Sequence, residues 1–354
     1  MSFAIWGLGI ALPEYSITQE LASELTSKVS GHDPDQARRL AALYRRSGVR
    51  KRHVALLDRL DLNAEPDGSP GAPTRARMEH YEEAIRPLAR EAAGRALASS
   101  GVAPVEITHL VTVSCTGFAA PGFDLSLFTG LGLDPGVQRT HVGFMGCHGA
   151  LNGLRVAAAF AAGDPSARVL LCAAELCSLH FQFGYDSDLA VSNALFADGA
   201  AAVVGRADSP GGSDAWRLVA SGSTLMPDTE DAMSWKIGDH GFVMTLSARV
   251  AGLIAENLRP WLEGWLRRRG LALADVASWA IHPGGPRILD AVEEALGLPR
   301  SATSESRDVL ATCGNMSSPT VLFILDRLRH RKAPRPCVSL AFGPGLAIEA
   351  ALFE

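Results

Sequence analysis

Cys147 is the residue whose surroundings most favour nucleophilic chemistry. It lies in HVGFMGCHGALNGLRVAAAFAAG (141–163), where it opens a run of small and apolar residues that predicts a buried helix. The first N–H groups of a helix are unpaired and the helix dipole is positive there, which favours a thiolate over a thiol. Gly146 and Gly149 suit a tight turn at such a helix start. The alternative is a cysteine used as a small core hydrophobe, and the segment alone does not decide between the two.

Two further residues, His282 and Asn315, would complete a site with Cys147. A thiol beside an imidazole yields a nucleophilic thiolate–imidazolium pair, and an uncharged amide is a suitable donor to an oxyanion. Taken singly, each has a structural alternative. His282, which precedes Pro-Gly-Gly, could be a packing residue at a strand end, and Asn315 could be the N-cap of the following helix.

An internal repeat predicts how these three residues meet. A long amphipathic helix at about 74–100 is followed by a strand at 107–115, and the segments 245–270 and 276–285 repeat that order when Gly101 is laid on Gly270. The same offset of 169 residues carries Val169 to Val338 and Cys147 to Met316, the neighbour of Asn315. Such a repeat indicates a duplicated α/β unit with the two helix starts face to face, and with His282 at a nearby strand end.

The N-terminal part predicts the remaining elements. After a first strand, Ser16 and Gln19 form a candidate capping box for a helix to about residue 28. A second helix at about 35–47 ends in a basic cluster, and the Pro- and Gly-containing stretch 59–75 predicts a surface loop. The cluster consists of Arg45, Arg46, Arg50, Lys51 and Arg52.

Composition excludes several classes of function. The chain has 354 residues, 47% of them hydrophobic, which is enough for a large core in one large or two fused domains. A formal charge of −5 argues against nucleic acid as a partner. Six cysteines without a C-x-x-C pair argue against a metal site, and no apolar run is long enough for a membrane span. The N-terminus predicts a strand, not a signal peptide, so we expect a reduced, cytoplasmic protein.

Motifs along the whole chain resemble the type III polyketide synthases, the chalcone-synthase-like branch of the thiolase superfamily. The most specific are GC-x-G at Cys147, HPGGPRILDAVE (282–293), GNMSSPTVLFILD (314–326) and FGPGL (342–346). PGFD (121–124), ALFADGAAAVV (194–204) and MPDTED…GDHGF (226–242) also match. The spacing of 33 residues between His282 and Asn315 adds to the specificity.

The resemblance implies a fold and a reaction. The fold is a duplicated, thiolase-like αβαβα layered structure, with halves at 1–206 and 207–354 and a homodimeric assembly. Cys147 would accept a starter acyl group from its coenzyme A ester, while His282 and Asn315 hold the thioester carbonyl of malonyl-CoA during decarboxylation. The enolate would then attack the acyl-cysteine in repeated Claisen condensations before cyclisation to a pyrone, resorcinol or phloroglucinol. No metal or redox cofactor is implied.

The resemblance also assigns positions along the substrate path. Phe196, in ALFADG, is one gate residue between tunnel and cavity, and the second gate position carries Met244, which is flexible enough to admit a longer acyl chain. Arg39 and Arg46 match two basic positions for CoA phosphates, whereas the third is Ala42. The loop expected to reach the partner subunit carries Ala120. The other cavity positions are Cys115, His180, Trp235, Ser317, Gly343, Pro344 and Gly345, and we expect Trp235 to narrow one wall.

Two alternatives stand beside this interpretation. The first is a 3-ketoacyl synthase III that takes its extender from acyl carrier protein, against which the HPGG and FGPGL motifs argue. The second is a catalytically silent homologue that binds acyl-CoA or a partner enzyme as a scaffold, against which the intact triad argues.

Overall fold

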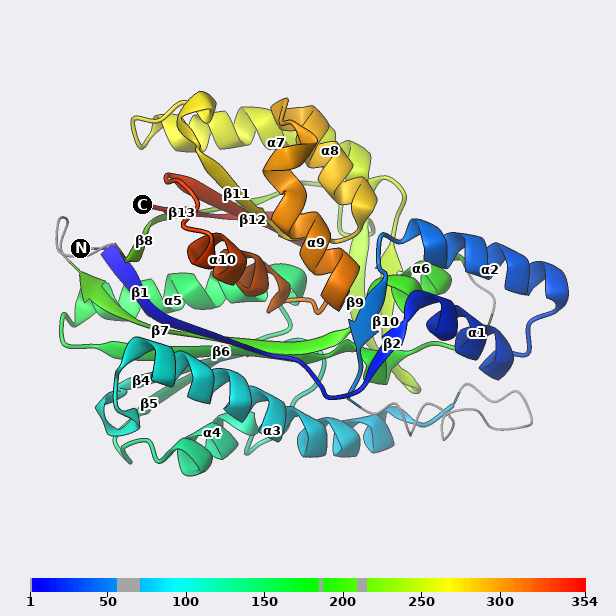
Figure 1. Cartoon of the computed structure of the whole chain (residues 1–354), viewed down its shortest axis with the longest axis horizontal. Coiled ribbons are helices and arrows are strands. Elements are labelled where there is room, and N and C mark those ends of the chain that lie inside the picture. The colour runs from blue at the N-terminus through cyan, green and yellow to red at the C-terminus, as the bar shows by residue number, and fades with distance from the viewer. Residues whose placement is uncertain (1, 56–70, 185–186, 209–214) are drawn as a thin grey trace.

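The computed structural model describes residues 2–55, 71–184, 187–208 and 215–354. Five layers alternate between helices and sheet, as Figure 1 shows: α7 and α8, the strands of the C-terminal half, α5 and α10, the strands of the N-terminal half, and α3 with α4. The predicted αβαβα architecture is therefore confirmed. The predicted loop at 59–75 lies mostly outside the described residues, and the division of the chain after residue 206 stays a prediction.

One sheet of nine strands runs through the molecule in the order β11-β12-β13-β8-β1-β7-β6-β4-β5. It contains β1 (Ser2–Ala11), β4 (His109–Ser114), β5 (Gln138–Gly143), β6 (Arg168–Leu176), β7 (Asp198–Asp208), β8 (Trp216–Leu225), β11 (Ser278–Ile281), β12 (Cys337–Gly343) and β13 (Ala347–Phe353). The parallel pair β4–β6 in one half corresponds to the parallel pair β11–β12 in the other. The antiparallel pair β1–β8 joins the halves, so the predicted duplication is present in the topology.

Each helical layer buries one face of these strands. The long helix α3 (Thr74–Ser100) and α4 (Phe123–Leu131) cover one side of the N-terminal half, and α7 (Val250–Arg267) with α8 (Pro286–Leu296) cover the C-terminal half. Between the halves lie α5 (Gly149–Gly163) and α10 (Thr320–His330). Because helices cover both faces, β6 is buried along nearly its whole length.

Smaller elements border the central layer at one end of the sheet. They are α1 (Gln19–Val29), α2 (Pro34–Arg46), α6 (Ser187–Leu195), α9 (Ser304–Cys313), the pair β2 (Ser16–Thr18) and β3 (Lys51–His53), and the hairpin of β9 (Met233–Gly238) and β10 (Gly241–Leu246). The predicted capping box at Ser16 is wrong, since Ser16 pairs with His53 in β2–β3 and Thr18 caps α1. A capping box does form at α2, from Asp33 and Gln36.

Candidate active site

The nucleophile turn connects the end of β5 to the central helix α5. Cys147 lies in a short 3₁₀ turn, Gly146–His148, immediately before α5, so it precedes the helix and does not open it. Gly146 has φ +71°, and a Cβ there would lie 2.6 Å from Pro344. Only glycine therefore suits this position, on grounds of both conformation and space. The Cys147 side chain is buried, with 6% of its surface exposed.

The FGPG loop (342–345) at the end of β12 packs against this turn. A Cβ on Gly343 would collide with the His148 ring, with Nε2 at 2.8 Å, so glycine allows the loop to pack directly on the residue next to Cys147. His148 is itself buried, and its Nδ1 lies 2.6 Å from Asn152 Oδ1. Gly345 has φ +125°, which also favours glycine. Gly343 and Gly345 thus shape the turn, and Pro344 contributes surface to the cavity at Cys147.

Asn315 and Ser317 approach Cys147 from the segment that precedes α10. Asn315 is held by its backbone, which pairs with Phe196 through bonds to Leu195 O and Ala197 N at 2.9 Å each. Its side-chain amide hydrogen bonds to the Cys147 sulfur, and its Oδ1 accepts from Ser317 N at 2.8 Å. The alternative role of Asn315 as a helix N-cap is excluded, because α10 is capped at Pro319.

His282 lies directly after β11, where its backbone N–H donates to Leu340 O at 2.8 Å. Its side chain is 1% exposed, and neither ring nitrogen has a hydrogen-bond partner among the described residues. Burial, with a smaller contribution from the charge of His148, lowers the pKa of His282 to about 3. Burying an imidazole without hydrogen-bond partners costs roughly 1–3 kcal/mol of folding free energy. The protein nevertheless keeps both ring nitrogens of His282 unpartnered, within the described part of the chain, near the nucleophile turn.

The pKa of Cys147 is shifted in the opposite direction to the sequence-based expectation. Burial is the main cause of a raised pKa of about 11; the Ser317 and Asn315 hydrogen bonds lower the pKa, and the Glu175 carboxylate raises it. The shift follows because desolvation of a buried charge outweighs the field of a single helix end.

Glu175 is a buried carboxylate that sequence reasoning missed. It ends β6 with 0% exposure and accepts from Cys115 N at 2.9 Å, Thr116 Oγ1 at 2.7 Å and Ser318 Oγ at 2.6 Å. Burial raises its pKa, and the Ser318 and Thr116 hydrogen bonds lower it. A lone acidic residue in the otherwise apolar strand RVLLCAAEL was the available signal. Glu175 ties the strand end that carries Cys115 to the segment that carries Ser317.

Cys115 and Cys147 contact the same hydroxyl group. Ser317 Oγ lies 3.3 Å from Cys115 Sγ and donates to Cys147 Sγ at 3.7 Å. Ser317 adopts φ +58°, an uncommon conformation for a residue with a side chain, and its neighbours hold it there. Cys177, a third buried cysteine that the sequence analysis did not assign, lines the same cavity.

His180 and Trp235 present apolar surface to the site because backbone groups satisfy their polar atoms. His180 Nε2 donates to Thr116 O at 2.6 Å and Nδ1 accepts from Phe242 N at 2.9 Å, which fixes one neutral tautomer. Burial lowers the pKa of His180 to about 3. Trp235 Nε1 donates to Cys115 O at 2.7 Å. Their rings pack edge to face at 5.3 Å and form a rigid wall.

Two adjoining cavities meet at this wall. The catalytic chamber has about 320 Å³ of empty space, including solvent at its opening, and is lined by Cys115, Thr116, Gly146, Cys147, Cys177, Phe196, Met233, Trp235, Met244, Ser317 and Pro344. The second cavity, here called the α1–α6 pocket, encloses about 890 Å³ including solvent at its opening. Both are lined by Phe196, Met244, Trp235 and Cys177, so the two predicted gate residues lie at the junction.

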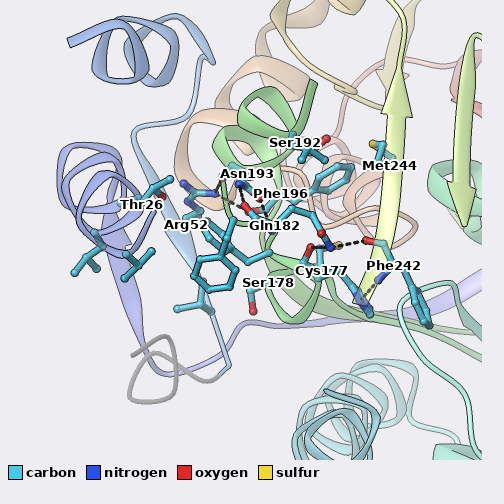
Figure 2. Close-up of a pocket in the computed structure, with 18 of the residues that line it drawn as sticks. Thr26, Arg52, Cys177, Ser178, Gln182, Ser192, Asn193, Phe196, Phe242 and Met244 are labelled. Carbon is cyan, nitrogen blue, oxygen red and sulfur yellow. Dashed lines mark hydrogen bonds between the residues drawn. The ribbon is translucent and has the colours of Figure 1, made fainter. Parts of the chain in front are cut away.

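Helices α1 and α6 provide the far walls of the α1–α6 pocket, as Figure 2 shows. Arg52 donates to the carbonyl groups of Asn193 and Phe196, the latter at 2.9 Å. Asn193 Nδ2 in turn donates to Gln182 O at 2.7 Å. The gate residue is therefore fixed through its backbone. The apolar lining comes from Ile17, Ala22, Leu25, Val29, Val54, Phe181, Phe183 and Leu189.

Four predicted positions lie outside both cavities. Arg39 and Arg46 are exposed on α2 and do not line the chamber or the α1–α6 pocket. Ala42 lies between them on the same helix. Ala120 lines a separate surface hollow beside α3 and α4. Their expected roles with CoA and with a second subunit stay predictions.

Two family models together match almost the whole chain. The model described as the N-terminal domain of chalcone and stilbene synthases matches residues 2–209, and the model of their C-terminal domain matches residues 217–354. Among solved structures, PKS-I from the brown alga Ectocarpus siliculosus superposes with a TM-score of 0.94 at 33% identity, covering 100% of this chain and 98% of that one.

Similar proteins of bacteria cover the same length. The alpha-pyrone synthesis polyketide synthase-like Pks18 of Mycobacterium tuberculosis is 34% identical over 99% of this chain and 90% of its own. The 1,3,6,8-tetrahydroxynaphthalene synthase of Streptomyces peucetius subsp. caesius is 36% identical over 97% of this chain and 91% of its own.

Proposed function

The chain belongs to the chalcone and stilbene synthase family and is a type III polyketide synthase, and from this premise we propose that Cys147, His282 and Asn315 are its catalytic residues. The observation that carries the proposal is the buried His282 imidazole, whose two nitrogens have no partner among the described residues. A substrate carbonyl is the natural acceptor for such a group.

In the loading step, Cys147 attacks the thioester carbonyl of the starter. The C–S bond to coenzyme A breaks as the new thioester forms, and the thiol proton passes through His282 to the departing CoA thiolate. Because burial raises the pKa of the Cys147 thiol, we expect its proton to leave as the sulfur attacks, with the His282 imidazole as its acceptor. Asn315 and Ser317 supply hydrogen bonds that favour the developing thiolate.

In the condensation step, malonyl-CoA loses carbon dioxide and leaves an enolate. His282 and Asn315 donate to the enolate oxygen, and the site has the donors for that charge. The enolate carbon then attacks the acyl-cysteine, the C–S bond to Cys147 breaks, and the released thiolate takes a proton from solvent, because the malonyl carboxylate supplies none. Carbon dioxide release supplies the driving force, so this chemistry requires no metal or redox cofactor.

We further propose that the starter is an aliphatic acyl group held in the α1–α6 pocket. The pocket wall is mostly apolar, and the polar atoms of His180 are bound to backbone groups, so His180 offers no donor that would select a hydroxylated aromatic ring. The chamber of about 320 Å³ is small, which favours few extensions. A short, tethered polyketide closes most readily by lactonisation, so the proposed product is an alkyl pyrone.

The test is a product assay with labelled malonyl-CoA and aromatic, short and long aliphatic acyl-CoA starters, followed by mass spectrometry. We expect alkyl pyrones from aliphatic starters in wild type, and a shift to shorter starters in Leu25→Trp, which fills the α1–α6 pocket. Leu21→Trp is the matched control, because Leu21 lies on the same helix but is exposed. An aromatic starter as the best substrate would contradict the proposed starter class.

We propose a homodimer that forms along β5. This strand is an edge of the large sheet and is largely exposed, and Phe118, Phe144 and Met145 near its end also expose apolar surface. An exposed edge strand beside an apolar patch favours association. Light scattering should give twice the chain mass of 37.4 kDa, and Phe118→Asp should reduce it.

We also propose a cytoplasmic location, since all six cysteines are unpaired thiols. Among the described residues, no helix has the length and apolarity to cross a membrane.

A further inference from the structure

Helix α2 carries four exposed arginines, of which only Arg39 and Arg46 have an expected role, in binding CoA phosphates. Arg38 and Arg45 are seven residues apart, as are Arg39 and Arg46, so the four side chains form two neighbouring columns. The two members of each column lie about two helical turns, roughly 10 Å, apart along the helix axis. All four are exposed, and Ala42 lies between the columns. We call this surface the α2 arginine face.

The positive charge of this face is mostly uncompensated. No carboxylate of the described residues forms an ion pair with Arg39, Arg45 or Arg46, and Arg38 pairs only with Asp35 of its own helix. Four like charges on one helix repel one another, although the whole chain carries a formal charge of −5. Such a concentration of positive charge attracts an acidic partner.

The opposite side of α2 faces the α1–α6 pocket. Leu40 and Tyr44 are buried there against Ala22 and Ala194, and Tyr44 Oη lies 2.8 Å from Thr26 Oγ1. Ala22 and Thr26 line the pocket. The inner side of α2 therefore supports the wall of the proposed acyl site, and the α2 arginine face lies on its outer side. Figure 1 shows α2 next to α1 and α6.

We propose that the α2 arginine face docks an acidic acyl carrier protein, which delivers the starter on its phosphopantetheine arm. Coenzyme A shares that arm, and its phosphates need only the column of Arg39 and Arg46. The second column, Arg38 and Arg45, matches carboxylates two turns apart on an acidic helix of the carrier. This inference rests on the proposed function, because it concerns how the starter reaches Cys147.

The transfer is a balanced thioester exchange. The Cys147 sulfur forms a bond to the acyl carbon, the bond from that carbon to the carrier sulfur breaks, and the Cys147 proton goes to the released phosphopantetheine thiol. Fatty-acid elongation is the class of reaction that produces aliphatic acyl groups on carrier protein, so such a reaction would supply the substrate.

The experiment compares two donors in single-turnover loading of Cys147, measured by intact-protein mass spectrometry. The probes are dodecanoyl-CoA and a bacterial fatty-acid acyl carrier protein charged with dodecanoyl. We expect wild type to load from both donors, and the Arg38→Glu/Arg45→Glu variant to lose about tenfold or more in rate with the carrier protein. Loading from dodecanoyl-CoA should change less than about twofold, and added salt should slow only the carrier reaction strongly.

Arg267→Glu/Arg268→Glu at the end of α7 is the matched control, since it reverses two exposed arginines away from α2 and should change neither rate. Loading from dodecanoyl-CoA but not from the carrier in wild type overturns the docking proposal and leaves the proposed function intact. An equal loss with both donors in the α2 variant also overturns it, since the face then serves CoA alone. Failure of wild type with both donors overturns the proposed starter class, and the docking proposal with it.

Discussion

The catalytic chamber and the α1–α6 pocket share a wall but are built in different ways. In the chamber, backbone pairing and a buried carboxylate fix almost every polar group, as the contacts of Asn315 and Glu175 show. In the α1–α6 pocket, apolar side chains such as Leu25 and Leu189 form most of the surface, and Arg52 and Asn193 hydrogen bond to backbone carbonyl groups beside it. From this comparison we expect the chemistry to depend on rigid positions in the chamber, and the choice of starter to depend on summed side-chain volume in the pocket.

The largest effect is expected for Cys147→Ala. Loss of the nucleophile should remove acyl loading and lower product formation by about 10³-fold or more, with little change in the unfolding transition. Intact mass after incubation with acyl-CoA checks the loading. Cys313→Ala, which removes a buried thiol outside both cavities, is the control and should load normally. Retained condensation in Cys147→Ala would place the nucleophile elsewhere.

His282→Ala should slow loading and decarboxylation by about 10²–10⁴-fold, because both steps need its proton transfer or hydrogen bond.

The pH dependence of Cys147 alkylation by iodoacetamide in wild type tests the protonation state of the thiol. A raised thiol pKa of about 11 leaves little thiolate at neutral pH, so the rate in wild type should rise about tenfold per pH unit from pH 7 to 10. A plateau already reached near pH 7 would instead support a resting thiolate–imidazolium pair.

Gly343→Ala tests whether the rigidity of the chamber matters. The added methyl group would collide with the His148 ring beside Cys147, so we expect kcat to fall by about 10–100-fold while the protein still folds. Gly252→Ala on α7 is the control, because open space surrounds that position, and it should leave kcat unchanged. Normal kcat in Gly343→Ala would show that the turn tolerates movement.

Met244→Phe should have the smallest effect, a shift in starter preference without loss of the reaction. Met244 lies at the junction of the chamber and the pocket, so a bulkier, stiffer ring should lower kcat/KM for long starters about tenfold and spare short ones. Competition between short and long acyl-CoA esters measures the ratio. An unaltered ratio would mean that Met244 does not control passage between the two cavities.

The sequence by itself determined the fold and part of the lining of the chamber. Helix 74–100 was predicted with the bounds that the structure has, because its apolar period and its terminal Gly101 are local signals. Cys147, Phe196, Met244 and Ser317 were assigned to one site, and the structure brings them together around one cavity. Their motifs are short and have fixed spacing, and such spacing can be recognised in the sequence alone.

Only the tertiary structure decided the protonation and the polarity of the site. The raised pKa of Cys147 depends on complete burial, and the inert faces of His180 and Trp235 depend on backbone groups more than 60 residues away along the chain. Glu175 likewise gains its partners from β4 and from the segment before α10. Desolvation and hydrogen-bond partners are properties of contacts between distant segments, so residue types and spacing alone could not supply them.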